Sequence, residues 1–587
     1  MADSGKAFDF KLFKRLLKLT NPYKRTFYFV ASAAIAMSAL GVLSPILLKM
    51  AIDQSITPKN AELLITFISL MFGVLFLEVI FQFSFIYFAN WLGQNVIKDL
   101  RVQLFKLMTG FKMQYFDKNA VGRLTTRAVN DIETISSIFS QGLFMIISDL
   151  LKMGAIAGVM LYMNWRLALI VFAILPFILY ATRVFQRAMK VAFEDVRNQV
   201  ANLNSFVQER ITGMKIVHIF NREKTEYDRF QEINNKHKKA WVKTVWYNSI
   251  FFPIAEMASS VAIGLVVWYG GLNAAEGGEI TLGIVTAFIQ FAQMLFRPLR
   301  QIADKFNTLQ MGMVAANRVF EILDTKSHIT NEGSEQLKDP KGAIAFKNVR
   351  FGYVENEEVI KDISFEVHPG ETVAIVGATG AGKSTIINLL NRFYEINSGS
   401  IYIDNVAIEQ YELASLRSQI AVVLQDVFLF ADTILNNITL GDSNVSEEDV
   451  VRAAKEIGVH QFISSLPAGY QYNVKERGVM LSSGQRQLLA FLRAYVSEPS
   501  ILILDEATSS VDSYSEEMIQ TATEKITKGR TSIVIAHRLA TIKKADKILV
   551  MDAGHIVETG THKELLQRTN GYYRNLYEVQ FMTEEAI

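Results

Sequence analysis

The first half of the chain contains apolar stretches that are long enough to cross a lipid bilayer. Residues 26–48 form a run of 23 without a charged side chain, and a membrane helix needs about 20 apolar residues. Five further stretches with few or no charges follow. Buried helices of soluble proteins seldom run so far without a polar stripe. The pattern predicts six membrane helices, at residues 26–48, 63–97, 134–165, 167–182, 244–275 and 280–296.

The distribution of Lys and Arg predicts the orientation of these helices. Seven basic residues precede the first stretch and seven more lie in residues 98–127, whereas residues 270–280 carry none. Basic loops stay on the cytoplasmic side of a membrane. The sequence therefore predicts a multi-pass protein of the cell (inner) membrane with a cytoplasmic N-terminus. Residues 1–25 are basic and amphipathic and lack the cleavage site of a signal peptide.

The composition agrees with a membrane protein and excludes several kinds of site. Half of the 587 residues are hydrophobic, which is more than soluble domains usually contain. The net charge of +2 gives no reason to expect a nucleic-acid partner. The chain has no cysteine, so disulfides, thiolate metal sites and cysteine nucleophiles are excluded.

The second half of the chain has a different texture. A polar segment, residues 324–342, is typical of a linker. From residue 343 short β-branched runs alternate with helical patterns, which indicates an α/β domain with a mostly parallel sheet. We therefore expect an all-α six-helix transmembrane domain over residues 26–323 and a cytoplasmic α/β domain over residues 343–587.

A phosphate-binding loop stands near the start of the second domain. The segment "GATGAGKST" follows the apolar run "TVAIV" and precedes a helical pattern, which is the context that the P-loop motif requires. Its glycines let backbone amides surround phosphates, and the helix N-terminus favours negative charge. The lysine is expected to reach the β- and γ-phosphates, and the serine to offer its hydroxyl to magnesium. The loop consists of Gly377, Ala378, Thr379, Gly380, Ala381, Gly382, Lys383, Ser384 and Thr385.

Polar residues follow three other predicted strands. Asp505 and Glu506 end "SILILDE", His537 ends "TSIVIAH", and Gln425 follows "IAVVL". Ligands bind at the carboxyl ends of parallel strands. Asp505 suits magnesium, and Glu506 is then placed to orient or deprotonate the attacking water. His537 could hydrogen-bond the γ-phosphate, and Gln425 could bridge magnesium or water to a moving segment.

These motifs, in this order, resemble the ATP-binding-cassette exporter superfamily, most closely its bacterial multidrug and lipid exporters. The resemblance covers nearly the whole chain and implies a half-transporter. In that family two cassettes meet head to tail, and each ATP lies between the phosphate loop of one copy and the "LSSGQ" signature of the other. By resemblance Tyr353 stacks on adenine, and "SSVD" ending in Asp512 is the D-loop. The implied signature contacts are Ser482, Ser483, Gly484 and Gln485.

The same resemblance marks two intracellular loops and two departures. "FDKNAVGRLTTRAVND" and "ERITGMKIVHIFNREK" resemble the loops whose short helices dock on the cassettes. Ser483 stands where the signature usually has glycine, so we expect the loop to use positive φ less freely. Lys475, in "NVKERG", stands where the exporter loop commonly has glycine.

The resemblance implies ATP-driven export of a hydrophobic or amphipathic substrate, a drug or a lipid, by alternating access. ATP and Mg²⁺ are the implied cofactors, and a second half-transporter and the lipid bilayer are the implied partners. A homodimer is expected, with a heterodimer as the alternative. An ATP-gated channel or a regulatory subunit is disfavoured, because such proteins tolerate loss of a carboxylate like Glu506.

Ionisable residues inside the predicted membrane helices are costly and usually face a bundle interior or water. Asp149 and Lys152 lie three apart in one helix, so we expect them to neutralise each other. Glu78 and Glu256 have no evident partner in the sequence. They could contact a cationic part of the cargo, pair with Arg297, or lie in solvent beyond the hydrocarbon.

Overall fold

The chain folds into two compact units. The computed structural model describes residues 9–329, 331–505, 513–536 and 538–580. The first unit comprises Met1–Thr109 and Val121–Lys326, and the second comprises Gly110–Ala120 and Ser327–Ile587. The second unit therefore includes a short segment taken from between two helices of the first.

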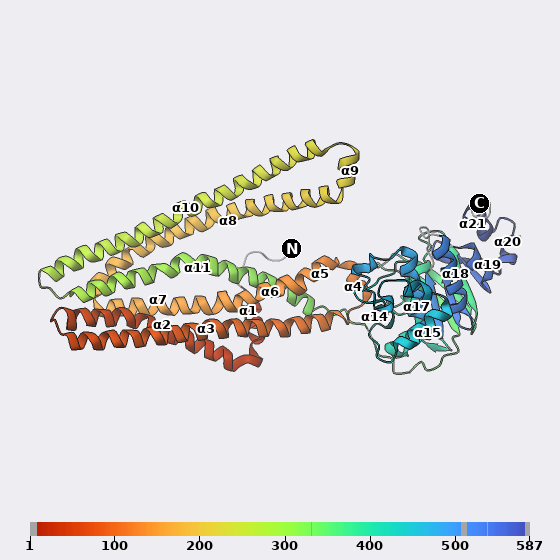
Figure 1. Ribbon diagram of the computed structural model, residues 1–587, viewed down its shortest axis with the longest axis horizontal. Coiled ribbons are helices and arrows are strands. Elements are labelled where there is room, and N and C mark those ends of the chain that lie inside the picture. Colours follow the sequence, from red (N-terminus) through yellow and green to blue (C-terminus); the bar gives the residue numbers. More distant parts are fainter. Residues whose placement is uncertain (1–8, 330, 506–512, 537, 581–587) are drawn as a thin grey trace. The chain divides into compact units, whose positions relative to one another are not determined.

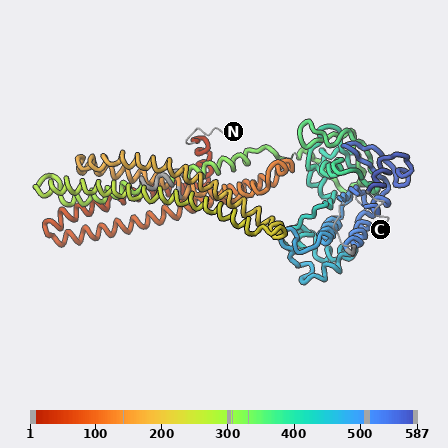
Figure 2. Tube along the Cα trace, turned by 90° about the horizontal axis from the view of Figure 1, so that it is seen from above, coloured from red at the N-terminus to blue at the C-terminus, as the bar shows by residue number. Residues whose placement is uncertain are grey.

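The first unit is entirely helical in its described part. Its long helices are α2, α3, α7, α8, α10 and α11, and α8 and α10 run side by side up to the bend at α9 (Figures 1 and 2). The elements are α1 (Phe10–Lys18), η1 (Asn21–Tyr23), α2 (Lys24–Ala51), η2 (Ile52–Ile56), α3 (Ala61–Met108), α5 (Val121–Thr126), η3 (Arg127–Asp131), α6 (Ile132–Ser137), η4 (Ile138–Leu143), α7 (Phe144–Met163), α8 (Trp165–Thr212), α9 (Met214–Ile219), α10 (Glu223–Ala275) and α11 (Leu282–Leu323).

The helices of the first unit match the predicted membrane stretches. Among the described residues, five helical segments are long and apolar enough to cross a membrane, and a shorter apolar stretch, Leu282–Pro298, begins α11. α3 and α10 have 48 and 53 residues, so at about 1.5 Å per residue both exceed a bilayer's thickness. The turn between the third and fourth stretches is at Asn164, whose side chain accepts the Leu167 N–H at 3.0 Å and so begins α8.

The surface of α3 is suited to lipid rather than to water. Phe72, Phe76 and Phe83 are each more than two-thirds exposed, and exposed apolar surface of this extent marks contact with a membrane or with another protein. The helix packs against α2.

One carboxylate joins the end of α2 to the start of α11. Asp53, in η2, accepts hydrogen bonds from the Thr281 hydroxyl at 2.6 Å and from the Gly283 amide at 2.9 Å. Thr281 is the N-cap of α11 and Gly283 lies in its first turn, where backbone N–H groups lack helical partners. A Cβ on Gly283 would lie 2.6 Å from both Asp53 Oδ1 and the Lys49 carbonyl oxygen, so only glycine permits this close approach.

The charges within the helices pair differently from the prediction. Asp149 forms its ion pair with Lys305 of α11 and not with Lys152. A methyl group built on Gly41 of α2 would lie 3.0 Å from Lys152 Nζ and 3.4 Å from Glu78 Oε1. The predicted Asp149–Lys152 pair is therefore wrong. Residues three apart on a helix can meet, but here Asp149 pairs instead with a lysine of a neighbouring helix.

In the described part of the first unit, three short segments are π-helical, with hydrogen bonds to the fifth residue along. η2 closes α2, and η3 and η4 lie between α5 and α7 on either side of α6. Such segments often occur at functional sites.

The amphipathic N-terminal helix α1 is held to the end of α11. Both terminal nitrogens of Arg15 donate to the Asp324 carboxylate at 2.6 Å, and the guanidinium lies 4.0 Å from the centroid of the Phe320 ring. The hydrogen bonds from Arg15 lower the pKa of Asp324. The predicted amphipathic segment is thus a helix with a defined partner.

The described residues of the second unit form two sheets. The larger has the order β10-β9-β3-β8-β7-β6, and all of its pairs are parallel except β10 with β9. The smaller has the antiparallel order β2-β1-β4-β5. The strands are β1 (Ile344–Phe351), β2 (Ile360–Val367), β3 (Thr372–Gly377), β4 (Ser398–Ile403), β5 (Val406–Ala407), β6 (Ile420–Val423), β7 (Ile501–Asp505), β8 (Thr531–Ile535), β9 (Lys547–Asp552) and β10 (His555–Gly560).

The mostly parallel sheet was predicted, but the antiparallel sheet was not. β1, from the run "AIAFKNVRF", pairs with β2 and β4 and lies outside the parallel sheet. Successive residues of β7 show how the layers stack. Leu502 packs into a core with Leu489 of α17, and Ile503 packs into the other core with Ile386 of α12. The parallel sheet therefore separates two cores, as in other α/β domains.

Helices lie around the strands of the second unit (Figure 1). They are α4 (Met113–Lys118), α12 (Lys383–Leu390), α13 (Leu413–Ser418), α14 (Ile434–Thr439), α15 (Glu447–Ile457), α16 (His460–Ser464), η5 (Gly469–Gln471), η6 (Glu476–Gly478), α17 (Ser483–Val496), α18 (Ser513–Thr527), α19 (Leu539–Lys544), α20 (His562–Gln567) and α21 (Tyr572–Gln580).

Candidate nucleotide site

The phosphate loop joins the central strand β3 to α12, as the motif requires. Gly382 caps α12 with φ = 96°, and Gly380 has φ = 86°, a conformation that residues with a Cβ adopt only at a cost. A Cβ on Gly382 would also lie 2.8 Å from Ile360 Cδ1 and 3.2 Å from the Val359 carbonyl oxygen. The glycines therefore allow the tight turn that directs backbone amides inward.

Lys383 lies at the start of α12 and is 7% exposed. Its ammonium donates to the carbonyl oxygens of Gly377 at 2.7 Å and Ala378 at 3.0 Å, so it lies across the mouth of its own loop. Burial lowers the pKa of Lys383, and the nearby charge of Asp505 partly opposes that shift. A desolvated ammonium in this place can exchange its carbonyl partners for phosphate oxygens.

Ser384 and Asp505 come together from two parts of the chain. The Ser384 hydroxyl donates to Asp505 Oδ2 at 3.3 Å. Asp505 ends β7 and is 8% exposed, so its carboxylate lies at the carboxyl edge of the parallel sheet. A hydroxyl and a carboxylate are hard oxygen donors of the kind that Mg²⁺ prefers. The pair therefore fits a magnesium ion beside the phosphate loop.

The predicted adenine contact, Tyr353, is part of an aromatic cluster. Its hydroxyl donates to the Thr385 hydroxyl at 3.2 Å and accepts the Asn388 amide at 3.1 Å, so the ring is tied to the phosphate loop and to α12. The ring meets Phe351 and Tyr394 edge-on, with centroids 4.9 and 5.0 Å away. These contacts hold the Tyr353 ring beside the phosphate loop, where the ring is expected to stack on the adenine base.

The remaining predicted residues at the sheet edge are partly described. Gln425 is exposed and follows β6, the strand next to β7, so it lies at the same edge as Asp505. Glu506, Asp512 and His537 lie outside the described residues, and their assigned roles stay predictions.

The signature segment forms the start of α17. Ser482 is the N-cap: its hydroxyl accepts the Gln485 amide at 3.2 Å, and the Gln485 side chain accepts the Ser482 amide at 2.9 Å. This reciprocal arrangement is a capping box. Gly484 is buried. Ser483 is the first residue of the helix and does not have positive φ. The expected restriction from replacing glycine therefore does not arise at this position.

Lys475 has an unusual backbone conformation that the sequence did not reveal. Its φ is 60° and its ψ is −174°, a region that is essentially restricted to glycine. Its amide donates to the Asn473 side chain at 2.9 Å. The conformation explains why a glycine is favoured at this place, and it means that Lys475 holds the loop in a strained state.

The resemblance predicted that a short helix of the first intracellular loop docks on a cassette, but the sequence did not show which contacts hold α4. Tyr394 donates a hydrogen bond to Asp117 of α4, and burial, followed by this hydrogen bond, raises the pKa of Tyr394. Next to α4, the Lys112 amide donates to the Ser327 carbonyl oxygen at 2.7 Å. Both contacts join residues more than 200 apart in sequence, so no local pattern could have indicated them. The first intracellular loop thus contributes a helix to the second unit, beside the aromatic cluster of Tyr353.

Comparison with known proteins identifies the family. The ABC transporter transmembrane region matches residues 27–299, and the ABC transporter domain matches residues 360–509. An ATP-dependent lipid A-core flippase of Idiomarina loihiensis is 36% identical over 577 residues, covering 97% of this chain and 98% of the relative.

Other relatives also align over nearly the whole chain. A putative multidrug export ATP-binding/permease protein of Bacillus subtilis is 33% identical over 575 residues, which cover 97% of this chain and 99% of the relative. A putative ABC transporter ATP-binding protein of Streptococcus pneumoniae is 37% identical over 569 residues, covering 97% of each. The chain therefore belongs to the ABC transporter family, as an exporter half-transporter that carries its transmembrane region and its ATP-binding domain in one polypeptide.

Proposed function

We propose that the chain exports a hydrophobic or amphipathic substrate across the cell membrane as a homodimer with two composite ATP sites. The observation that carries the proposal is the convergence of Lys383, Ser384 and Asp505 beside the phosphate loop, in a chain whose other unit consists of long apolar helices. Binding of ATP closes the cassettes, the membrane helices change from inward-facing to outward-facing, and hydrolysis resets the cycle. The N-terminus and the cassette lie in the cytoplasm.

Each residue of the site has a proposed part in this cycle. Lys383 binds the β- and γ-phosphates, and Tyr353 stacks on the base. Ser384 and Asp505, with Gln425, hold magnesium, which when bound neutralises phosphate charge. Glu506 follows Asp505 directly and accepts a proton from the attacking water, and His537 contacts the γ-phosphate.

The signature of one copy completes the site of the other. The N-terminus of α17 carries amides and a positive dipole end that favour a phosphate, and Ser482 is exposed there. Asp512 is the D-loop residue of the same interface. ATP therefore acts as the link between the two cassettes.

Substitution of Glu506 by Gln tests the hydrolytic role. This change leaves the phosphate loop intact and removes the base, so ATP should bind normally, while the steady-state ATPase rate should fall at least 100-fold and nucleotide should stay trapped. Lys383→Ala should instead weaken nucleotide binding itself. A Glu506→Gln protein that still hydrolyses ATP at near the normal rate would exclude Glu506 as the base.

A mixed dimer tests the composite sites, and the capping box determines the choice of variant. Ser482→Asp keeps a side chain that caps α17 well but places a negative charge against the phosphate. Ser482→Asn caps the helix without the charge and is the matched control. A Lys383→Ala copy paired with a Ser482→Asp copy should keep one intact site, whereas a homodimer of either variant should have none.

The readout is occlusion of nucleotide in co-expressed, separately tagged copies. Recovery in the mixed dimer, compared with both homodimers, supports sites built across subunits. No recovery would exclude them. A wild-type chain that is inert alone and active only with a different half-transporter would replace the homodimer by a heterodimer.

A further inference from the structure

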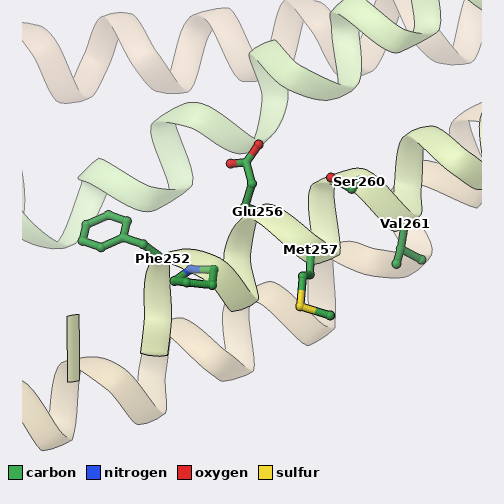
Figure 3. Close-up of a pocket in the computed structure, with 6 residues that line it drawn as sticks. Phe252, Glu256, Met257, Ser260 and Val261 are labelled. Atoms are coloured by element: carbon green, nitrogen blue, oxygen red, sulfur yellow. The ribbon is translucent and has the colours of Figure 1, made fainter. Parts of the chain in front are cut away.

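Two hollows in the described part of the chain differ in how they are built. The larger, of about 810 Å³, is lined by residues of α10 between Phe252 and Val261 (Figure 3), so it is the open face of one helix. The smaller, of about 330 Å³, lies in the second unit and is lined by residues of α18, α19, β3 and β8. Several elements therefore enclose the smaller hollow, and its volume lies at the lower end of the range of small-molecule sites, about 300–1,000 Å³.

The smaller hollow lies at the opposite edge of the parallel sheet from the nucleotide site. Thr372, the first residue of β3, lines the hollow, whereas the phosphate loop begins at Gly377, the last residue of the same strand. Five steps along a strand, at about 3.3 Å each, separate these two residues by about 17 Å. A ligand in the hollow would therefore not overlap with ATP.

The lining of the hollow combines apolar side chains with positive charge. Val534 of β8 is fully buried and Ala540 of α19 is half-buried, whereas Lys528 and Lys544 are exposed. Among the residues that the structure describes, Lys528 makes no hydrogen bond or ion pair. Its ammonium can therefore bind an anion without giving up another partner.

The chain around the hollow is basic. Residues 524–547 contain seven Lys or Arg and two acidic residues, and such an excess raises the local concentration of anions. The carbonyl groups at the end of α18 would oppose an anion, but Arg530 covers two of them. Its guanidinium donates to the Ile526 carbonyl oxygen at 3.0 Å, and its amide donates to that of Thr527 at 3.2 Å.

Two ion pairs join α18 to α19, and one of them lies in the wall of the hollow. Arg538, which precedes α19, pairs with Glu516 at 3.6 Å, and Lys544, the last residue of α19, pairs with Glu524. Glu524 and Lys544 both line the hollow. An anion bound there competes with Glu524 for Lys544, so its binding changes the contact between the two helices.

Both helices continue from residues with predicted roles in hydrolysis. α18 begins at Ser513, directly after Asp512, and α19 begins at Leu539, two residues after His537. A change in the contact between α18 and α19 can therefore reach the nucleotide site through the chain itself. This link rests on the roles proposed above for Asp512 and His537.

We propose that the hollow between α18 and α19 is a regulatory site for a small ligand that carries an anionic group on an apolar body. Lys528 and Lys544 bind the anionic group through charge-assisted hydrogen bonds, and Val534 and Ala540 contact the apolar body. Binding weakens the Lys544–Glu524 pair and slows hydrolysis at saturating ATP.

The probes are 3-phenylpropionate, which carries a carboxylate, and 3-phenylpropanamide, which has nearly the same shape and no charge. Both are added to full-length protein in nanodiscs of zwitterionic lipid. Binding is measured as slowed hydrogen exchange in residues 518–530 and 539–546, and hydrolysis as the rate of ADP release.

Four variants locate the binding site. Lys528→Gln removes one proposed anion contact, and Lys528→Arg keeps its charge. Glu524→Gln removes the acid that competes for Lys544. Lys525→Gln is the matched control, because it removes the same charge from the same helix at a residue that does not line the hollow.

The expected result is binding of the carboxylate and not of the amide. 3-Phenylpropionate should slow exchange in both segments and lower kcat at least twofold, with the KM for ATP unchanged. Lys528→Gln should weaken its binding at least fivefold, whereas Lys528→Arg and Lys525→Gln should stay within twofold of the wild type. Glu524→Gln should tighten binding at least threefold, a gain that a damaged fold would not produce.

Three outcomes would overturn the inference. Equal effects of the two probes on exchange, or no effect of either, would exclude an anion site. A raised KM for ATP with unchanged kcat would place the carboxylate in the nucleotide site instead. Slowed exchange with unchanged kcat would exclude the regulatory role. The exchange measurement requires neither hydrolysis nor transport, so a failure of the proposed export would not affect it.

Discussion

Replacing Lys475 by glycine should stabilise the second unit. Lys475 has φ = 60° and ψ = −174°, a combination that glycine adopts freely and that costs other residues about 1–3 kcal/mol. The side chain is exposed, so its removal loses little packing. Glycine also raises the conformational entropy of the unfolded chain, and this lowers the gain in stability by about 0.4–1 kcal/mol. The net gain in the free energy of unfolding should be about 1–2 kcal/mol.

The gain can be measured as a shift in the melting temperature of the second unit. For a domain of 150–250 residues each kcal/mol moves Tm by about 2–4 °C, so we expect a rise of about 2–8 °C. All five tryptophans lie in the first unit, so tryptophan fluorescence would not report this change. Scanning calorimetry of the full chain, with hydrogen exchange of the peptide around η6, gives the required readout.

Two control substitutions separate strain from other effects. Lys475→Ala removes the same charge but keeps a Cβ, so it should leave Tm within about 1 °C of the wild type. Arg477 has φ = 55° and ψ = 18°, a milder left-handed conformation, and its replacement by glycine should gain less. If Lys475→Gly melts no higher than Lys475→Ala, the backbone of Lys475 is not strained and the reasoning fails.

Three further predictions concern contacts elsewhere in the chain. Gly382→Ala should weaken ATP binding and destabilise the second unit by about 1–2 kcal/mol, because it places a Cβ at positive φ; a variant with normal ATP affinity would refute this. Tyr394→Phe removes the hydrogen bond to Asp117 and should speed hydrogen exchange in α4 while ATP affinity stays normal; unchanged exchange would contradict it. The chain has no native cysteine, so the double variant Asp53→Cys/Thr281→Cys can form only the one engineered disulfide. That disulfide should hold the end of α2 to the start of α11 and stop transport until a reductant is added. Transport that continues in the oxidised protein would show that this contact need not open.

Local sequence patterns predicted the phosphate loop and its surroundings well. The turn from β3 to α12 depends on glycines and on a strand followed by a helix, and all of these are contiguous in sequence. Asp505 was placed correctly because the end of a parallel strand determines the edge at which its side chain lies. The stretches of membrane helix were equally visible, because a bilayer requires uninterrupted apolar length.

Contacts between distant segments could not be predicted in the same way. Asp149 and Lys152 had the right spacing to pair, yet Asp149 pairs with Lys305 of another helix, and that contact depends on how the helices pack. The antiparallel sheet was missed for a similar reason, since the pattern of β1 does not specify its partners. The backbone conformation of Lys475 could not be predicted either, because the sequence shows which residue is present and not which φ it adopts.

The π-helical segments before α7 have a consequence for the helical phase of the membrane unit. A turn bonded to the fifth residue contains one residue more than an α-helical turn. If η3 or η4 changed to α-helical bonding, the turn would contain one residue fewer. The following helix would then rotate by about 100° and shift by about 1.5 Å, which is the rotation and rise of one α-helical residue. Asp149 lies only a few residues beyond η4, so such a change would carry its carboxylate away from Lys305. The register of one turn thus determines which face of α7 is presented to α11.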